Sequence, residues 1–238
     1  MRKEPFTVDN FIHVFNRGNR KQPIVHTDKD RDRFLRMLYY FNTEETPNNL
    51  FQELTRLKLL RSDLNNFPWL KGWPSRKPIV SILSFTLMEN HFHLLLKEIK
   101  DGGTARFMQK LGTGMTMYYN LKYQETGRLF QGAYKARCVD ENVYLKYVNI
   151  YIQVKNLLEL YPGGLEKAVK EFNKAYAWAI NYSYSSLGDF VGARERGIID
   201  KDIFLELFGN PEEYKEFARD CILHMNLDEK LEEVVVKI

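Results

Sequence analysis

Cysteine is scarce in this sequence, with only Cys138 and Cys221 among 238 residues. The two residues are far apart and form no CxxC pair or Cys/His cluster, so the sequence predicts neither a disulfide framework nor a structural zinc site. This cysteine usage fits a reducing compartment, and we expect a cytoplasmic protein.

Long apolar runs are also missing. The first residues, MRKEPFTVDN, do not resemble a signal peptide, and no later run approaches the roughly 18 apolar residues that span a bilayer. We therefore expect neither secretion nor membrane insertion. The sequence also lacks the GxxxxGK[ST] loop that holds nucleotide phosphates, and it shows no internal repeat.

The composition is that of a globular, mildly basic protein. Hydrophobic residues make up 44% of the chain and charged residues 28%, with a formal net charge of +4 and a pI of about 8.8. A chain of this length can bury one good core, so we expect one main domain. The positive charge suits a polyanionic partner without requiring one.

Strand and helix patterns are mixed along the chain without regular βαβ alternation, which predicts an α+β class. Residues 43–78 have a looser pattern that indicates an insertion or a long hairpin, and residues from 165 onward are mainly helical in pattern. The predicted strands are 11–16, 79–87, 91–97 and a short strand within 127–139, and the predicted helices are 28–41, 104–123 and 140 or 141 to about 158.

The run HFHLLLK places His91 and His93 two residues apart on a predicted strand. Alternate strand residues point to the same face, so both imidazoles project together while Phe92 turns into the core. Neutral imidazoles bind Mn²⁺ and other transition ions well and Mg²⁺ less readily, usually with further oxygen ligands. The alternative is one buried, hydrogen-bonded histidine beside a solvent-facing one.

Several segments together resemble the HUH single-tyrosine transposases, most closely the group related to REP-associated tyrosine transposases. The resemblance extends from residue 11 to about residue 192, apart from the insertion. Its segments are FIHVFNRGNRKQPIV, DKDRDRFLRML, SFTLMENHFHLLLK, GRLFQGAYKAR, DENVYLKYVNIYI and AYAWAINYSYSSLGDFVG.

This resemblance implies a ferredoxin-like or RRM-like fold, in which an antiparallel sheet carries the histidines at its centre and helices pack on one face. It implies a catalytic domain over residues 1–192, interrupted by the insertion at about 43–78. Residues 193–238 would then form a helical C-terminal extension.

The resemblance also indicates the nucleophile. Tyr144, Tyr147 and Tyr151 share one face of the predicted helix, and the residues alone do not choose among them. The family places its nucleophile seven residues after a tyrosine-leucine pair and directly before isoleucine, which selects Tyr151, with Tyr147 as second choice.

One position departs from the family pattern. Four residues after the nucleophile the family usually has Gln or Asn as a third metal ligand, whereas this chain has Lys155, which cannot bind a cation when charged. Asn156 and Gln153 are nearby, but a plain helix turns Gln153 to the other side. Lys155 is instead a candidate to contact the scissile phosphate or to lower the pKa of Tyr151.

The resemblance implies cleavage and rejoining of single-stranded or hairpin DNA. His91 and His93 would hold Mg²⁺ or Mn²⁺, and Tyr151 would form a 5′-phosphotyrosine that is later rejoined without ATP. Basic side chains near the first and fourth strands are the predicted DNA contacts, although each is equally consistent with an ordinary solvated charge. They are Arg17, Arg20, Lys21, Arg128, Lys135 and Arg137.

Three other functions stay open from the sequence. The first is a domesticated nucleic-acid-binding protein whose catalysis is weakened by Lys155. The second is a replication-initiator nickase, and the third is a metal-dependent hydrolase of small phosphoesters, which would leave Tyr151 without a special role. The sequence does not decide between a monomer and a homodimer.

Overall fold

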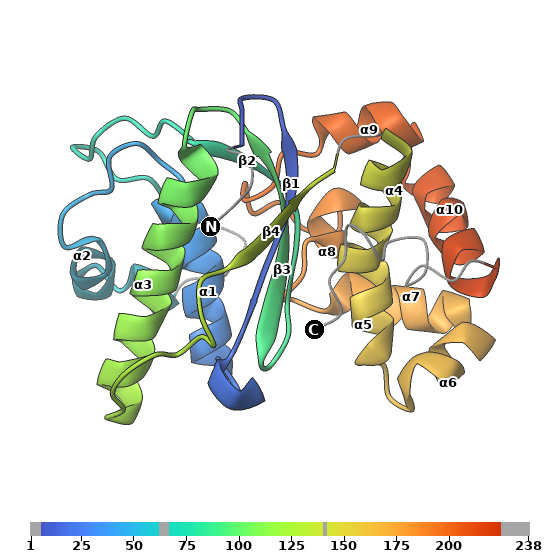
Figure 1. Ribbon diagram of the computed structural model, residues 1–238, viewed down its shortest axis with the longest axis horizontal. Coiled ribbons are helices and arrows are strands. Elements are labelled where there is room, and N and C mark those ends of the chain that lie inside the picture. The colour runs from blue at the N-terminus through green and yellow to red at the C-terminus, as the bar shows by residue number, and fades with distance from the viewer. Residues whose placement is uncertain (1–5, 62–66, 140–141, 225–238) are drawn as a thin grey trace.

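The structure is a computed structural model that describes residues 6–61, 67–139 and 142–224. A central sheet separates two groups of helices (Figure 1). The helices in these ranges include none that is both long and apolar enough to cross a membrane.

The sheet has four antiparallel strands in the order β2-β3-β1-β4. With the two helices that connect them, the strands follow one another as β1-α1-β2-β3-α3-β4, which is the ferredoxin-like arrangement that the sequence predicted. The prediction of an α+β fold is therefore confirmed. The strands are β1 (Phe11–Arg17), β2 (Val80–Leu87), β3 (His91–Glu98) and β4 (Lys135–Cys138).

Helices α1 (Asp28–Phe41) and α3 (Gly103–Tyr123) cover one face of the sheet, as predicted (Figure 1). Alternate strand residues such as Val14, Phe92 and Leu94 are buried against them, and the Phe34 ring lies 5.3 Å from that of Phe92. The alternation of side chains along the strands therefore places one set of residues in the first hydrophobic core, between the sheet and helices α1 and α3.

The opposite face is covered as well, by helices that begin after β4 (Figure 1). Leu83 and Leu95 belong to this second core, which also includes α9 and α10 of the predicted C-terminal extension. The sheet is thus buried between two helical layers. The helices of the second layer are α4 (Asn142–Ile150), α5 (Asn156–Glu159), α6 (Gly164–Lys170), α7 (Phe172–Asn181), α8 (Leu187–Phe190), α9 (Asp202–Phe208) and α10 (Pro211–His224).

Between α4 and α5 the chain widens into one π-helical turn, η3 (Tyr151–Lys155). The backbone N–H of Asn156 donates to the carbonyl of Tyr151, five residues earlier. The Thr86 hydroxyl donates to the Ile152 carbonyl within this turn. The sequence predicted one regular helix here, so that prediction was wrong about the interior of the helix. The predicted start of the helix, at Asp140 or Glu141, lies outside the described residues.

The predicted insertion, residues 43–78, packs against α1. It contains α2 (Leu50–Arg56) and the 3₁₀ turn η2 (Leu59–Arg61). The Tyr40 hydroxyl on α1 donates to the Pro68 carbonyl, and the Trp73 indole donates to the Glu53 carboxylate. The insertion therefore extends the core on the α1 side, away from the face that carries the histidines.

Candidate active site

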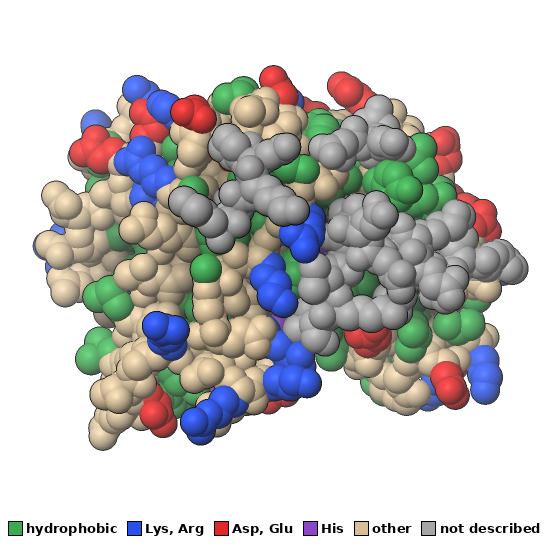
Figure 2. Space-filling view, in the orientation of Figure 1, with side chains coloured by type: hydrophobic (Ala, Val, Ile, Leu, Met, Phe, Trp, Pro, Cys, Tyr) green, Lys and Arg blue, Asp and Glu red, His purple; other side chains and the backbone are tan. Residues whose placement is uncertain are grey.

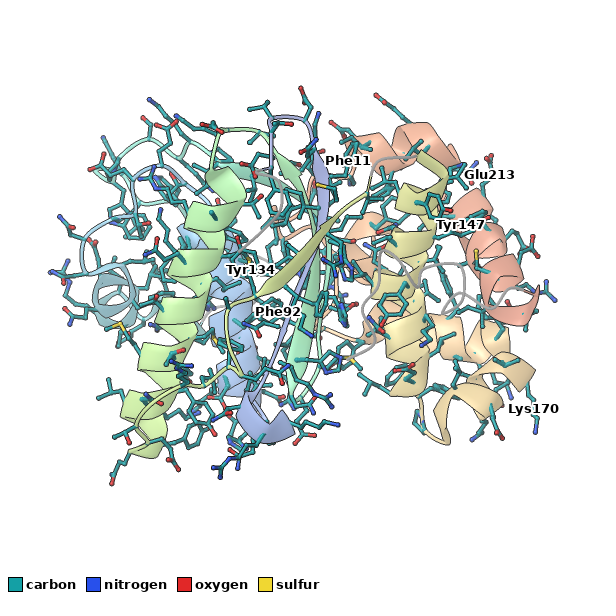
Figure 3. All side chains as sticks on the ribbon, viewed as in Figure 1. Phe11, Phe92, Tyr134, Tyr147, Lys170 and Glu213 are labelled. Carbon is teal, nitrogen blue, oxygen red and sulfur yellow. The ribbon has the colours of Figure 1, made fainter. Side chains whose placement is uncertain are left out.

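His91 and His93 lie on the face of β3 opposite Phe92, as the alternation predicts. Their ring centroids are 5.3 Å apart. His93 is fully buried and His91 is partly buried. In Figure 3, Phe92 lies on the α1 and α3 side of the sheet, so the two histidines face the second helical layer.

Each imidazole has one nitrogen already hydrogen-bonded within the protein. His91 Nδ1 lies 2.7 Å from Oδ1 of Asn90, an oxygen that only accepts, so this nitrogen carries the proton. His93 Nδ1 lies 2.9 Å from Nε2 of His13 on β1. If His93 donates there, both residues present the lone pair of Nε2, as metal-bound histidines do.

The environment of the two rings favours their neutral form. Burial, and then the nearby charge of Arg17, lowers the pKa of His91 to about 4. Burial also holds the pKa of His93 well below its usual value, with further contributions from His13, His91 and Lys155. Neutral imidazoles are the form that binds metal ions.

These residues fit the divalent cation that the sequence implies. Nε2 of His93 is buried without a hydrogen-bond partner among the described residues, a costly state for a polar atom that a cation would relieve. No cluster of three or more His, Cys, Asp or Glu side chains able to hold an ion occurs in the described ranges. Further ligands must therefore be other oxygen donors, such as amides, water or phosphate.

Tyr151 is the helix tyrosine that lies beside the histidines. Its ring centroid is 5.5 Å from that of His93 and 6.2 Å from that of His13. Tyr147 instead stacks on Phe217 of α10, with centroids 5.7 Å apart, and Tyr144 is 38% exposed. The packing of α4 and η3 thus separates the three tyrosines that the sequence alone could not distinguish.

Lys155 lies within the same site. Its Nζ is 5.3 Å from the centroid of the Tyr151 ring and 2.7 Å from a carboxylate oxygen of Glu159. Only 14% of its side chain is exposed, and its charge is one cause of the lowered pKa of His93. A positive charge so placed is suited to attract a phosphate group.

Gln153 is not available as a ligand. Its amide donates to the Ser186 hydroxyl at 2.7 Å, and its Oε1 accepts from the Tyr214 hydroxyl at 2.8 Å. The side chain is completely buried in this network, which joins η3 to α10. Gln153 therefore has a structural role, consistent with the expectation that it faces away from the site.

The predicted DNA contacts lie along one edge of the sheet. Phe15 pairs with Lys135 and His13 with Arg137, so these two cations share the face of the histidines. The bridge between Gly18 and Phe130 brings residues 17–21 beside Arg128. Figure 2 shows Lys and Arg side chains in a row down the middle of the side of the molecule that it views.

A volume of about 310 Å³ opens beside this row, lined by Phe15, Arg17, Lys135 and the loop of residues 131–133. Phe15 also stacks on His93, with ring centroids 5.7 Å apart. The space combines an aromatic ring with two cations next to the candidate metal ligands, a combination that suits a nucleotide.

His13 is the residue of this site that the sequence analysis missed. It is fully buried and stacks on His93, with ring centroids 5.1 Å apart. Its only signal in the sequence is its alternation with Phe11 and Phe15 in FIHVFN. The alternation predicts the face of β1 on which His13 lies, but it does not predict that β3 is the neighbouring strand.

Residues 75–155 match the model of the family described as Transposase IS200 like. The match contains β2, β3, α3, β4, α4 and η3, and therefore His91, His93 and Tyr151. The match confirms the predicted resemblance over this part of the chain.

Other comparisons give distant likeness or none. A solved structure of a REP-associated tyrosine transposase bound to a REP hairpin aligns with a TM-score of 0.44 and 12% sequence identity. The alignment covers 85% of this chain and 88% of that chain. No curated protein matches the sequence.

Proposed function

We propose that this protein is a transposase that cleaves and rejoins single-stranded or hairpin DNA through a 5′-phosphotyrosine on Tyr151. His91 and His93 hold Mg²⁺ or Mn²⁺ in this proposal. The observation that carries it is the placement of the Tyr151 ring 5.5 Å from His93, whose buried Nε2 lacks a partner in the described part of the chain.

The residues divide the chemistry as follows. The Tyr151 oxygen attacks phosphorus, the bond to the 3′ oxygen breaks, and that oxygen takes up a proton to leave a free 3′-OH. Lys155 favours the loss of the phenolic proton through its positive charge. A bound cation would neutralise charge on the phosphate. Attack of a 3′-OH on the phosphotyrosine reverses the step, so rejoining requires no ATP.

The sheet edge supplies the DNA contacts. Lys135 and Arg137 stand on the histidine face of β4, and Arg17 ends the neighbouring strand. Phosphate pairing to such cations positions a strand without reading its sequence. Phe15, between Lys135 and His93, offers a ring on which a base can stack.

The test uses single-stranded hairpin DNA labelled at its 3′ end, incubated with the protein and Mg²⁺ or Mn²⁺. The 5′-phosphate side of the cut stays on the protein, so a labelled adduct should survive denaturation. DNA labelled at its 5′ end should release a shorter strand with a 3′-OH and give no labelled adduct.

Tyr151→Phe should abolish the adduct, whereas Tyr144→Phe and Tyr147→Phe should retain it, because the Tyr147 ring stacks on Phe217 and Tyr144 is 38% exposed. An adduct that persists in Tyr151→Phe would refute the assignment. DNA binding by the wild type without any adduct would favour the nucleic-acid-binding alternative.

A further inference from the structure

Thr86 on β2 lies between the two halves of the candidate active site. It pairs with His93 in the register of β2 and β3, so the two side chains share one face of the sheet. The Thr86 hydroxyl donates to the carbonyl of Ile152, the residue that follows Tyr151. The Thr86 side chain is fully buried, so this hydrogen bond is made away from bulk water. Thr86 thus links the sheet beside His93 to the turn that carries Tyr151.

The π-helical turn makes the Ile152 carbonyl available to Thr86. In a regular α-helix this carbonyl would accept the backbone N–H of Asn156, four residues later. In η3 the Asn156 N–H bonds instead to the Tyr151 carbonyl, five residues earlier. A side chain that enters the backbone hydrogen-bond ladder is a known cause of such irregularities in helices. The Thr86 hydroxyl therefore replaces the donor that the widened turn takes away from Ile152.

A second contact ties the same turn to β2. The Gln153 amide donates to the Ser186 hydroxyl at 2.7 Å, and this hydroxyl oxygen accepts the backbone N–H of Phe85 at 2.8 Å. Two successive residues of the turn, 152 and 153, are thus anchored at two successive residues of β2. Tyr151 directly precedes the anchored residues, so the placement of its ring depends on these anchors.

We infer that Thr86 is a positioning residue, whose hydroxyl holds the π-helical turn so that Tyr151 stands beside His93. This inference rests on the proposed function, in which the Tyr151 oxygen attacks the phosphate. Such an attack requires the nucleophile to be held close to phosphorus and in line with the bond that breaks. In this role Thr86 acts through Tyr151 and contacts neither the DNA nor the cation.

Thr86→Val tests the role of the hydroxyl at nearly constant side-chain shape. The substitution leaves the Ile152 carbonyl without its side-chain donor. The rate of adduct formation with hairpin DNA and Mn²⁺, measured in single turnovers, should fall by at least about 10-fold, because a displacement of about 1 Å can cost about 100-fold. The affinity for the same DNA, measured by fluorescence anisotropy, should stay at the wild-type value.

The position of the Tyr151 ring has a readout that requires neither DNA nor a cation. This ring stands nearly perpendicular to the His93 imidazole, at 84°, so the imidazole shifts the nuclear magnetic resonance signals of the tyrosine ring. In protein with ¹³C-labelled tyrosine rings, the Tyr151 signal is the one that Tyr151→Phe lacks. This signal should move in Thr86→Val and should keep its wild-type position in Thr86→Ser, which retains the hydroxyl.

Ser84→Ala is the matched control. Ser84 lies two residues before Thr86 on β2 and is equally buried, but its hydroxyl has no hydrogen-bond partner in the part of the chain that the structure describes. Ser84→Ala should keep both the adduct rate and the Tyr151 signal. Thr86→Ala and Thr86→Ser both lose the methyl group and differ only in the hydroxyl, so this pair gives the answer if Thr86→Val does not fold.

The outcomes separate this inference from the proposed function. A Tyr151 signal and an adduct rate that are both unchanged in Thr86→Val would overturn the inference and leave the proposed function intact. Equal losses in Thr86→Ser and Thr86→Ala would also overturn it, because the packing of the methyl group would then be the cause. If the wild-type protein forms no adduct, the proposed function fails, whereas the Tyr151 signal still decides whether Thr86 holds that ring beside His93.

Discussion

His13 fixes the orientation of a candidate metal ligand from the neighbouring strand. Its Nε2 lies 2.9 Å from Nδ1 of His93, and the two rings are stacked. A partner on the second imidazole nitrogen holds the ring and its tautomer, which strengthens the metal bond. We therefore expect His13 to be a positioning residue for His93, as Asn90 is for His91.

His13→Ala should weaken Mn²⁺ binding by about 10-fold to 100-fold, because His93 would lose the partner that orients it. Calorimetric titration of the purified variant measures this change. His26→Ala is the control, since His26 bonds to the Tyr119 hydroxyl on the other side of the sheet. Equal affinities for His13→Ala and the wild type would refute the positioning role.

At the scale of elements, a buried carboxylate ties α1 to α3. Asp30, in the first turn of α1, accepts hydrogen bonds from Tyr118, Lys122 and Tyr123 near the end of α3. Burial alone would raise the pKa of this carboxyl, but bonds from Lys122, Tyr123 and two backbone N–H groups hold it well below its ordinary value of 3.8. The charged form is therefore the stable one.

Because the folded pKa of Asp30 is lowered, its carboxylate stabilises the fold above pH 3.8, and this contribution is lost as the pH falls below that value. Asp30→Asn should lower the free energy of unfolding at pH 7 by about 1–3 kcal/mol and flatten its decrease in acid. Urea unfolding at several pH values measures both effects.

The control is Asp101→Asn, which changes an exposed carboxylate. It should alter neither the free energy of unfolding at pH 7 nor the decrease of that free energy in acid. An acid dependence of stability that is identical in Asp30→Asn and the wild type would exclude Asp30 as its source.

At the scale of the whole molecule, two helical layers cover the faces of the sheet, and we propose that nucleic acid binds along its β4 edge. The α1 layer and the insertion lie on one face, and the helices after β4 bury the other (Figure 1). The edge strand β4 carries Lys135 and Arg137 toward the histidine face. The DNA path that we propose therefore follows this edge.

Lys135→Ala and Arg137→Ala should each weaken binding of single-stranded DNA, with little dependence on its sequence. Each should also reduce the slope of log affinity against log salt concentration by about 0.7, the value for one phosphate contact on a single strand. Fluorescence anisotropy at several salt concentrations measures both. Lys170→Ala is the control, because Lys170 lies on α6, far from β4 (Figure 3). If neither Lys135→Ala nor Arg137→Ala reduced the slope of log affinity against log salt concentration, this DNA path would be ruled out.

The sequence by itself determined the strands, the shared face of His91 and His93, and the resemblance to the IS200-like transposases. These features depend on local alternation and on residue order, which are visible along the chain. The same local signals left Tyr144, Tyr147 and Tyr151 equivalent until the family resemblance selected one.

Only the tertiary structure brought His13 to His93 and formed the π turn at Tyr151–Lys155. The contact between His13 and His93 depends on the pairing of β1 with β3, since these residues are 80 positions apart. The π turn depends on packing against the sheet, where the Thr86 hydroxyl donates a hydrogen bond to the Ile152 carbonyl within the turn. Strand pairing and helix packing join distant residues, and a local pattern does not encode such contacts.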